Sequence, residues 1–169
     1  MSIDSTDTAV TRSEAETVDL GRRLGERLAP GAVVALVGPL GAGKTRFVRG
    51  LAAGAGILDP GAVRSPTYVL HHVYPGSRFS LHHVDAYRLS GAREFEALDV
   101  RGAMEPRDVL VVEWADRVRE AIDEGALWVR IAMGSSGAPD ERDFAFGKGP
   151  SRSGPGRGGS PTGRNQGSR

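Results

Sequence analysis

Hydrophobic residues near the N-terminus recur with the period of an α-helix. Leu20, Leu24 and Leu28 are four positions apart, which places them on one helical face. The preceding residues 13–16 read Ser-Glu-Ala-Glu, the Ser-x-x-Glu pattern of a capping box. In a capping box the two polar side chains bond to N–H groups that the first turn leaves unpaired. The pattern therefore predicts a helix that begins at about Ser13 and ends near Leu28.

Two apolar runs further along the chain have no such period. Residues 32–37 read Ala-Val-Val-Ala-Leu-Val, and residues 109–112 read Val-Leu-Val-Val. A strand reads as a continuous apolar run when both of its faces are buried, as in the centre of a parallel sheet. We therefore predict two central strands. After the first of them, Phe47 and Leu51 lie on one face of a predicted second helix.

The other segments are assigned from the same patterns and from turn residues. Residues 68–74 and 78–85 predict a β-hairpin, because Pro-Gly-Ser at 75–77 is typical of a turn. The remaining predicted elements are helices near 92–98 and 116–124 and closing strands at 127–133 and 142–146. Helices that alternate with buried strands predict an α/β domain of three layers with a mixed, mostly parallel sheet.

The composition is that of a single globular domain. With 169 residues, 39% of them hydrophobic, the chain can bury one core of ordinary size. It contains no cysteine, which excludes disulfides and thiolate metal sites. No apolar run is long enough to span a bilayer, and residues 1–12 lack the composition of a secretory signal. We expect a cytoplasmic protein without a membrane segment that is monomeric when isolated.

Basic residues are concentrated at the C-terminal end. Of 22 Lys and Arg, five follow residue 146, so residues 1–146 carry 17 basic against 21 acidic side chains. Residues 147–169 contain no acid and no hydrophobic residue, and such a segment cannot offset the entropy of ordering. We predict a flexible N-terminus at 1–12, a folded domain at 13–146 and a disordered tail at 147–169. The tail either contacts RNA weakly or is a solvated appendage, and its composition favours the appendage.

A phosphate-binding motif follows the first predicted strand. Residues 38–45 read Gly-Pro-Leu-Gly-Ala-Gly-Lys-Thr and satisfy G-x-x-x-x-G-K-T, the signature of P-loop NTPases. Its glycines let backbone N–H groups approach phosphates at the N-terminus of the next helix. Lys44 bridges the terminal phosphates, and the Thr45 hydroxyl ligates the Mg²⁺ that they share. The motif predicts a P-loop NTPase-like domain that binds a nucleotide with Mg²⁺.

A P-loop also needs carboxylates to complete its metal site. Two acids, Asp85 and Glu113, follow predicted strands. Either can be the equivalent of the Walker B acid, and each can instead be a strand-end acid that faces solvent. Trp114 follows Glu113 directly and packs either at this site or in the core.

The absence of two residue types from the folded domain limits which nucleotide it can bind and how fast it can hydrolyse it. The only Asn and the only Gln are Asn165 and Gln166, both in the predicted tail. The folded domain therefore has no Asn-Lys-x-Asp guanine motif and no Gln to orient an attacking water. We predict ATP rather than GTP. Hydrolysis by the chain alone is expected to be slow, unless a carboxylate such as Glu113 positions the water or a partner supplies the missing groups.

Four histidines lie on the predicted hairpin as two adjacent pairs, at 71–72 and 82–83. Adjacent strand residues point to opposite faces, so only alternate members can converge. We favour a structural or solvent-facing role over a metal site for them.

Five motifs taken together resemble the TsaE (YjeE) family. They are the P-loop at 38–45, Phe-Val-Arg-Gly at 47–50, Ser-Pro-Thr at 65–67, His-Val-Asp-Ala-Tyr-Arg-Leu at 83–89 and Val-Glu-Trp at 112–114. The P-loop is shared with many NTPases, whereas the last three motifs in this order are specific to the family. The resemblance covers residues 13–146 and excludes the tail.

This resemblance implies a function in tRNA modification. Members of the family are bacterial ATPases needed to make threonylcarbamoyladenosine in tRNAs that read codons beginning with A. The chain would act with the TsaB–TsaD pair, which transfers the threonylcarbamoyl group, and would meet tRNA only indirectly through that complex. ATP binding or hydrolysis would reset or license the complex.

The resemblance also implies roles for individual residues. Lys44, Asp85 and Glu113 would be catalytic, and Thr45 and Glu113 would bind Mg²⁺. Thr67 would lie in a switch-like loop that responds to the γ-phosphate. The nucleotide-binding residues would be Gly38, Gly41, Ala42, Gly43, Lys44, Thr45, Arg46, Thr67 and Arg142, with residues 13 and 14 on the adenine side.

Two positions depart from the family pattern. Pro39 stands where Asp is common, and Arg46 stands where a second Thr is common. Neither change removes a phosphate donor, but Arg46 can alter nucleotide affinity or hydrolysis.

Two other classes of function share parts of this pattern. A small-molecule kinase has a P-loop and a small α/β core, but it needs a lid with catalytic arginines, and no distinct lid insertion is visible. A non-catalytic interaction module would use ATP only to select the conformation that docks.

Overall fold

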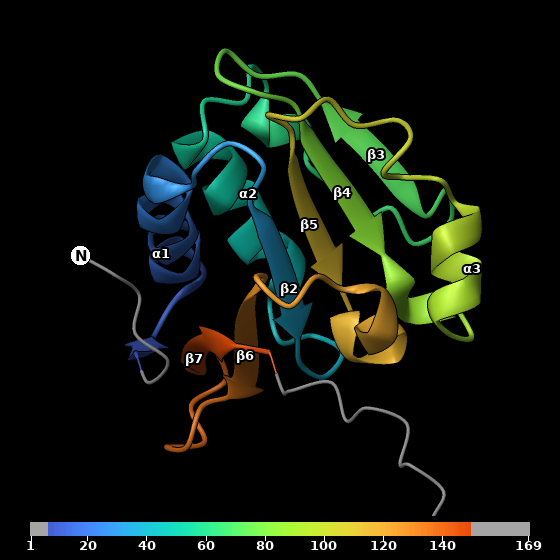
Figure 1. The fold of residues 1–169 in the computed structure, drawn as a ribbon. Helices are drawn as coiled ribbons and strands as arrows, with labels where there is room; N and C mark the ends of the chain where they lie inside the picture. The colour runs from blue at the N-terminus through green and yellow to red at the C-terminus, as the bar shows by residue number, and fades with distance from the viewer. Residues whose placement is uncertain (1–6, 150–169) are drawn as a thin grey trace, which may run out of the picture.

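The computed structural model describes residues 7–149. Its strands are β1 (Thr8–Thr11), β2 (Val33–Val37), β3 (His71–Tyr74), β4 (Leu81–Asp85), β5 (Val109–Glu113), β6 (Leu127–Met133) and β7 (Arg142–Lys148). They form one sheet in the order β1-β7-β6-β2-β5-β4-β3 (Figure 1). The four central strands are parallel neighbours, and β3, β7 and β1 pair antiparallel at the two sides. The predicted α/β fold with a mixed, mostly parallel sheet is confirmed.

Helices cover both faces of this sheet (Figure 1). The α-helices are α1 (Glu14–Arg27), α2 (Lys44–Gly54) and α3 (Ala92–Ala97), and the 3₁₀ helices are η1 (Pro60–Ala62), η2 (Ala86–Arg88) and η3 (Ala115–Ala121). The first two α-helices pack on one face, and α3 and η3 pack on the other. The helix predicted near 116–124 is therefore a shorter 3₁₀ helix, with a kink at Val118. None of the helices within residues 7–149 is long and apolar enough to cross a membrane.

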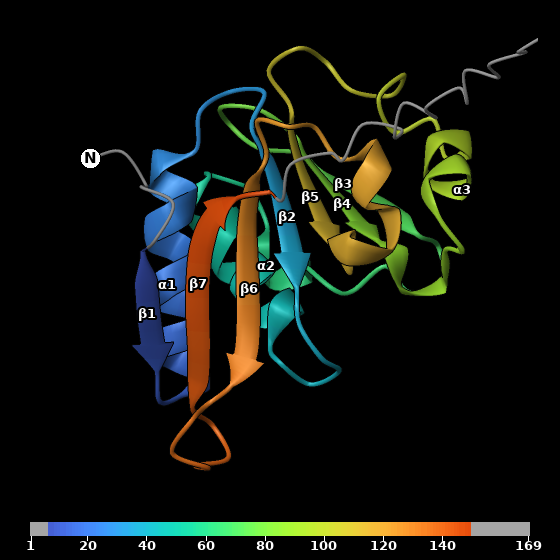
Figure 2. The ribbon, with the colours of Figure 1, turned by 60° about the horizontal axis from the view of Figure 1, so that its bottom comes forward.

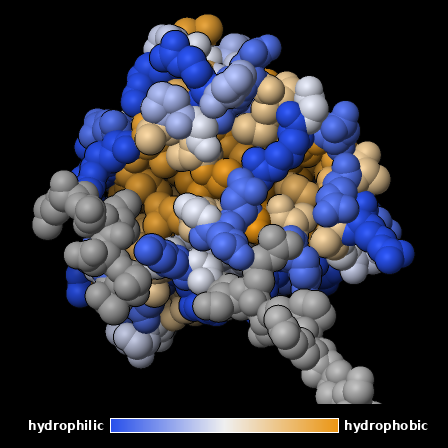
Figure 3. All heavy atoms as spheres, viewed as in Figure 1, coloured by the Kyte–Doolittle hydropathy of each residue, from blue (hydrophilic) through white to orange (hydrophobic). Residues whose placement is uncertain are grey.

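Alternate residues of the central strands supply the two cores. In β2, Val34 and Leu36 point to the core with α1 and α2, whereas Val33 and Ala35 point to the core with α3 and η3. All four are buried, which is why this strand reads as an uninterrupted apolar run. In Figure 3, apolar side chains are visible in the middle of the molecule and are bordered by polar ones.

Close packing of α1 on α2 holds the P-loop helix in place. Two glycines of each helix face the backbone of the other. A Cβ atom at Gly50 would lie 1.9 Å from the Val18 carbonyl oxygen, and one at Gly25 would lie 2.1 Å from the Leu51 carbonyl oxygen. Since no Cβ atom fits at these distances, the glycines are required by the approach of the two backbones.

The predicted start of α1 is confirmed in detail. The Ser13 hydroxyl accepts a hydrogen bond from the Glu16 N–H at 3.1 Å. The Glu16 carboxylate accepts one from the Arg12 N–H at 2.8 Å, one residue before the cap. This start orients α1 beside β1, and the hydroxyls of Thr11 and Thr17 are 2.8 Å apart.

The chain ends differ from the sequence prediction. Residues 1–12 were expected to be flexible, but Thr8–Thr11 form β1, an edge strand paired with β7 (Figure 2). Thr8 lies opposite Ala145 in this pairing, and no local pattern in a four-residue strand reveals so distant a partner. At the other end, β7 continues to Lys148, into the predicted tail. The rest of that tail, 150–169, lies outside the described residues.

Candidate nucleotide site

The P-loop connects the C-terminal end of β2 to the start of α2. Gly41 has φ +77° and Gly43 has φ +94°, backbone conformations that favour glycine. Gly38 is required for another reason, because a Cβ atom there would lie 2.2 Å from the Ile131 carbonyl oxygen. The loop therefore places the N-terminus of α2, with N–H groups that have no intrahelical acceptor, at the edge of the sheet.

Lys44 is buried at the centre of this loop. Its Nζ donates hydrogen bonds to the carbonyl oxygens of Gly38 at 2.8 Å and Pro39 at 2.9 Å. The same ammonium lies 3.7 Å from the centroid of the Trp114 ring, a cation–π contact. Burial lowers the pKa of Lys44, although the nearby carboxylates of Glu113 and Asp85 oppose this shift. An ammonium has three N–H donors, so these two bonds leave one N–H of Lys44 for another acceptor, such as a phosphate oxygen.

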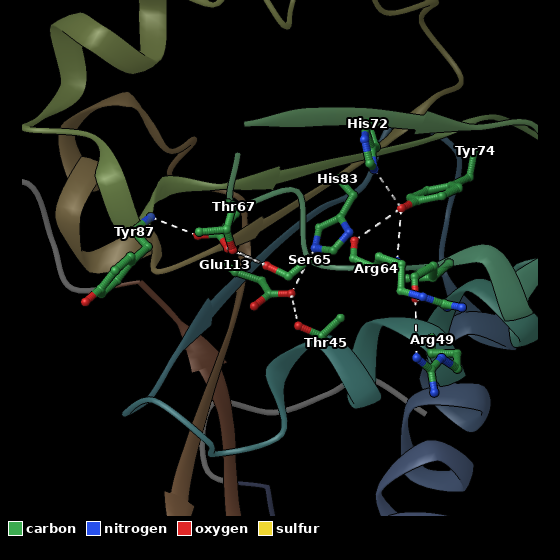
Figure 4. A network of polar contacts seen from close by, with 12 residues as sticks. Thr45, Arg49, Arg64, Ser65, Thr67, His72, Tyr74, His83, Tyr87 and Glu113 are labelled. Carbon is green, nitrogen blue, oxygen red and sulfur yellow. Dashed lines mark hydrogen bonds and ion pairs between the residues drawn. The ribbon is translucent and has the colours of Figure 1, made fainter. Parts of the chain in front are cut away.

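Glu113 ends β5 directly opposite the P-loop helix (Figure 4). Its Oε1 accepts a hydrogen bond from the Thr45 hydroxyl at 2.9 Å, and it also lies 2.9 Å from Nε2 of His83. Glu113 is only 2% exposed, so it is not a strand-end acid facing solvent. Of the two candidate acids, Glu113 is therefore the one in contact with the P-loop threonine.

Asp85 ends the neighbouring strand β4, in register with Glu113, and it binds a different segment. Its Oδ2 accepts hydrogen bonds from the hydroxyls of Ser65 at 2.5 Å and Thr67 at 2.7 Å (Figure 4). Its Oδ1 accepts one from the Tyr87 N–H at 2.9 Å. Asp85 therefore holds the loop that carries Thr67 against the end of the sheet.

A second anchor holds the start of that loop. The Tyr74 hydroxyl lies 3.2 Å from both the N–H and the carbonyl oxygen of Arg64, and it also lies 3.1 Å from Nδ1 of His72 (Figure 4). Leu70, where the loop ends, has φ +66°, and its carbonyl oxygen accepts the Asp85 N–H at 3.1 Å. The loop is thus tied down at its start, middle and end.

These elements enclose a cavity of about 390 Å³ at the carboxyl end of the parallel strands. Its volume is in the range of ligand pockets, and its place is the one where open α/β sheets bind ligands. The lining residues are Leu40, Gly41, Gly43, Lys44, Thr45, Arg46, Ser65, Thr67, Asp85, Tyr87, Glu113 and Trp114. Trp114 has φ +58°, an unusual conformation for a bulky residue and one that clusters at functional sites.

Five residues of the predicted site do not line this cavity, namely residues 13 and 14, Gly38, Ala42 and Arg142. Gly38 and Ala42 lie in the loop behind it, and Ala42 is fully buried. Arg142 lies on β7, where its Nη2 donates to the Gly41 carbonyl oxygen at 3.3 Å. Together with Glu14 and Arg46, which form an ion pair, it lines a small recess beside the P-loop.

Ser65, Tyr87 and His83 also belong to the site, but no role in it was predicted for them from the sequence. Ser65 and Tyr87 stand inside the quoted motifs but carried no predicted role. His83 is two residues before Asp85, so both point to the same face of β4, and this alternation was the signal available.

The donor set fits a magnesium ion only if a nucleotide supplies further oxygens. Thr45 offers a hydroxyl and Glu113 a carboxylate, both ligand types that Mg²⁺ accepts. Among residues 7–149, no group of three or more His, Asp or Glu side chains is arranged to hold a metal by itself. Mg²⁺ usually keeps several waters and binds through one or two protein ligands plus phosphates, so this sparse set agrees with that ion.

The site combines a glycine loop between a buried parallel strand and a helix, a buried lysine, and a threonine that faces a strand-end acid. Together these features define a P-loop-like nucleotide-binding fold. A family profile described as "Threonylcarbamoyl adenosine biosynthesis protein TsaE" matches residues 11–143. The chain belongs to the TsaE family, as the sequence motifs predicted.

Individual relatives agree with this assignment. The chain is 45% identical over 126 residues to the tRNA threonylcarbamoyladenosine biosynthesis protein TsaE of Streptomyces coelicolor, covering 73% of this chain and 83% of that protein. It is 38% identical over 128 residues to the protein of the same name from Treponema pallidum, covering 76% and 93%. The crystal structure of Bacillus subtilis YdiB superposes with a TM-score of 0.63 at 26% identity, covering 86% of this chain and 87% of that one.

Proposed function

We propose that this protein is an ATP-binding, weakly hydrolysing component required for threonylcarbamoyladenosine modification of tRNAs that read codons starting with A. It acts with the TsaB–TsaD complex, contacts tRNA indirectly through that complex, and works in the cytoplasm. The observation that carries the proposal is the Thr45 hydroxyl bonded to Glu113 across the mouth of the P-loop in a chain of the TsaE family.

The phosphate-binding and metal-binding groups of the cavity have separate tasks in this proposal. The N–H groups at the start of α2 and the Lys44 ammonium bind the phosphates. Thr45 and Glu113 hold Mg²⁺, which would offset the charge on the β- and γ-phosphate oxygens. Lys44 has one N–H beyond the two bonded to the Gly38 and Pro39 carbonyl oxygens, and it would donate this N–H to a phosphate oxygen.

Thr67 is proposed as the residue that reports the state of the nucleotide. Its hydroxyl is bonded to Asp85 and lines the cavity, within a loop whose ends are held by Tyr74 and by the Asp85 backbone. If the Thr67 hydroxyl exchanged its bond to Asp85 for a bond on the γ-phosphate side, this loop would move, as in NTPases with ordered switches. The loop surface would then differ between the nucleotide-bound and nucleotide-free protein, which a partner can detect.

Hydrolysis by the chain alone is proposed to be slow. The first 164 residues contain no Gln, so the water-orienting group of many NTPases is absent from the domain. Among residues 7–149, Glu113 is the acid bonded to the P-loop threonine, but its Oε1 already accepts two hydrogen bonds. A partner-dependent ATPase is therefore the activity we expect.

Reconstitution tests the proposal. TsaB, TsaD, tRNA, a threonylcarbamoyl donor and ATP are combined with wild-type protein, with the Lys44→Ala variant, or without the chain, and the modified tRNA is measured over many turnovers. We expect continued modification only with the wild-type protein. Equal modification without the chain would overturn the proposed function.

A second variant distinguishes the proposed ATPase from the alternative of a non-catalytic interaction module. Glu113→Ala is compared with wild type for ATP binding, ATP turnover and tRNA modification in the same system. We expect turnover and modification to be lost together. Full modification without turnover would favour the module, in which ATP only selects the docking conformation.

A further inference from the structure

His83 is a buried histidine in direct contact with the proposed magnesium site. It lies in β4, is completely buried, and its Nε2 is 2.9 Å from the Glu113 Oε1 atom (Figure 4). Its other ring nitrogen, Nδ1, is also buried and has no hydrogen-bond partner within residues 7–149. The imidazole therefore makes one hydrogen bond there, and that bond goes to Glu113.

The direction of this bond follows from the chemistry of its two partners. An ionised carboxylate can only accept hydrogen bonds, so Nε2 of His83 must carry the hydrogen and donate it. Nδ1 has no hydrogen-bond partner within residues 7–149, so no second bond competes with the one to Glu113. The ring is thus held in the tautomer that fixes Glu113.

Two donors on one oxygen leave the other oxygen of Glu113 available. The Thr45 hydroxyl and the His83 N–H both reach Oε1, at 2.9 Å each. Both of these bonds therefore go to the same carboxylate oxygen, and neither goes to Oε2. Since Thr45, at the start of α2, is itself a proposed ligand of Mg²⁺, His83 is the donor that holds the carboxylate from within the sheet.

We propose that His83 is a positioning residue, which orients the Glu113 carboxylate toward Mg²⁺ and so sets how strongly Mg²⁺ increases nucleotide affinity. The inference rests on the proposed function of this cavity as an ATP and Mg²⁺ site. His83 touches neither nucleotide nor metal in this role. Partners that orient a metal ligand in this way commonly change metal affinity by about 10- to 100-fold when they are removed.

The adjacent histidine provides a matched control. His82 is in the same strand and is equally buried, but it points to the other face of the sheet. Its Nε2 lies 3.2 Å from Asp108 and its Nδ1 lies 3.0 Å from His71, and it has no contact with Glu113. A leucine at either position replaces a buried imidazole with an apolar side chain. At 82 it removes the contacts with Asp108 and His71, and only at 83 does it remove the bond to Glu113.

The test measures ADP affinity by calorimetry, with Mg²⁺ and with EDTA, for wild type and for the variants His83→Leu, His83→Gln and His82→Leu. The thermal unfolding of each variant is recorded in parallel. The gain is the ratio of ADP affinity with Mg²⁺ to ADP affinity in EDTA. We expect this ratio to be about tenfold smaller in His83→Leu than in wild type, with unchanged affinity in EDTA. His83→Gln keeps a donor N–H at a similar reach and should restore the gain. His82→Leu should keep the gain even where its unfolding temperature is lower.

Other results would overturn the inference. These are a full Mg²⁺ effect in His83→Leu, an equal loss in His82→Leu, or no rescue by His83→Gln in a folded protein. Nitrogen NMR of histidine-labelled wild-type protein tests the same point without a substitution, and it should find the His83 hydrogen on Nε2. A hydrogen on Nδ1 alone would refute the inference. If wild type itself binds no nucleotide, the proposed function fails instead, and the two failures are distinct.

Discussion

Lys44 and Trp114 connect the phosphate-binding loop to the end of β5 through a single contact. The ammonium lies over the indole ring at 3.7 Å while it donates to the loop carbonyl oxygens. Phosphates at the loop would draw the ammonium away from those oxygens, because a charged donor binds an anion more strongly than a neutral carbonyl. The environment of Trp114 therefore depends on whether nucleotide is bound.

This dependence predicts an optical signal. ADP binding should change the tryptophan fluorescence of wild type and of Trp128→Phe, because Trp128 lies on β6, outside the cavity. The change should be absent in Trp114→Phe, provided that calorimetry shows this variant still binds ADP. A fluorescence change that persists in Trp114→Phe and disappears in Trp128→Phe would contradict the assigned position of Lys44.

At the scale of single residues, the sequence predicted which residues form the site better than it predicted the contacts between them. The motif identified Lys44 and Thr45 because the spacing of a P-loop is local. The choice between Asp85 and Glu113 was left open by the residues alone, since it depends on which strand end faces α2. The contact of His83 with Glu113 was missed for the same reason, because it depends on β4 lying beside β5.

Among the secondary-structure elements, α1 and α2 form the most closely packed pair. Their glycines allow backbone contact, and this contact fixes where α2, and with it the P-loop, meets the sheet. Substitution of such a glycine must push the helices apart, since the neighbouring atoms are backbone and cannot rotate away.

Gly50→Ala is therefore expected to be strongly destabilising. The new Cβ atom would lie 1.9 Å from the Val18 carbonyl oxygen, and overpacking of this kind costs about 3 kcal/mol or more of the free energy of unfolding. Gly125→Ala is the control, because nothing lies within 4 Å of its Cβ position. Urea denaturation should show a large fall in midpoint for the first variant only. Similar midpoints for both would show that the helices are less closely packed than described.

Asp108 joins the start of β4 to the connection that precedes β5. Its carboxylate accepts hydrogen bonds from the N–H groups of Ser80 at 2.8 Å and Glu105 at 2.9 Å, and it lies 3.2 Å from His82 Nε2. Burial acts to raise the pKa of Asp108, but the N–H groups of Glu105 and Ser80 and the His82 ring outweigh it, so the pKa is lowered.

The lowered pKa of Asp108 predicts the pH dependence of one substitution. An acid with a pKa lower in the folded state stabilises the fold above its unfolded pKa, and this contribution is lost as pH falls through the folded pKa. Asp108→Asn should therefore destabilise the protein by about 1 kcal/mol at pH 7. The difference from wild type should shrink as pH falls below 3.8, the ordinary value for Asp. Urea denaturation between pH 7 and pH 3 measures it, and a difference that grows toward low pH would contradict the assignment.

Helices and strands could be predicted from the sequence where the pattern that specifies them lies within the element itself. The capping box and leucine spacing gave α1, and the apolar runs gave β2 and β5, because burial on both faces leaves a mark in the sequence itself. β1 was missed because it exists only through its pairing with β7, far along the chain. η3 was predicted as a longer α-helix because helical spacing does not distinguish a kinked 3₁₀ segment.

At the scale of the whole molecule, one end of the parallel sheet gathers every residue of the proposed mechanism. β2, β4 and β5 end side by side, and they deliver the P-loop, Asp85 and Glu113 to one cavity. The antiparallel strands β1 and β7 on one side and β3 on the other extend the sheet (Figure 2). In the proposed function, the nucleotide would lie between a fixed half, β5 with α2, and the anchored loop that carries Thr67.

Titration calorimetry of ATP with and without Mg²⁺ tests this account most directly, with wild type compared with Thr45→Val. The valine keeps the shape of threonine but removes the hydroxyl that contacts Glu113. We predict one ATP site per chain, tighter binding with Mg²⁺ in wild type, and loss of that gain in Thr45→Val with binding in EDTA retained. Absence of ATP binding by wild type, or an equal Mg²⁺ effect in both proteins, would contradict the account.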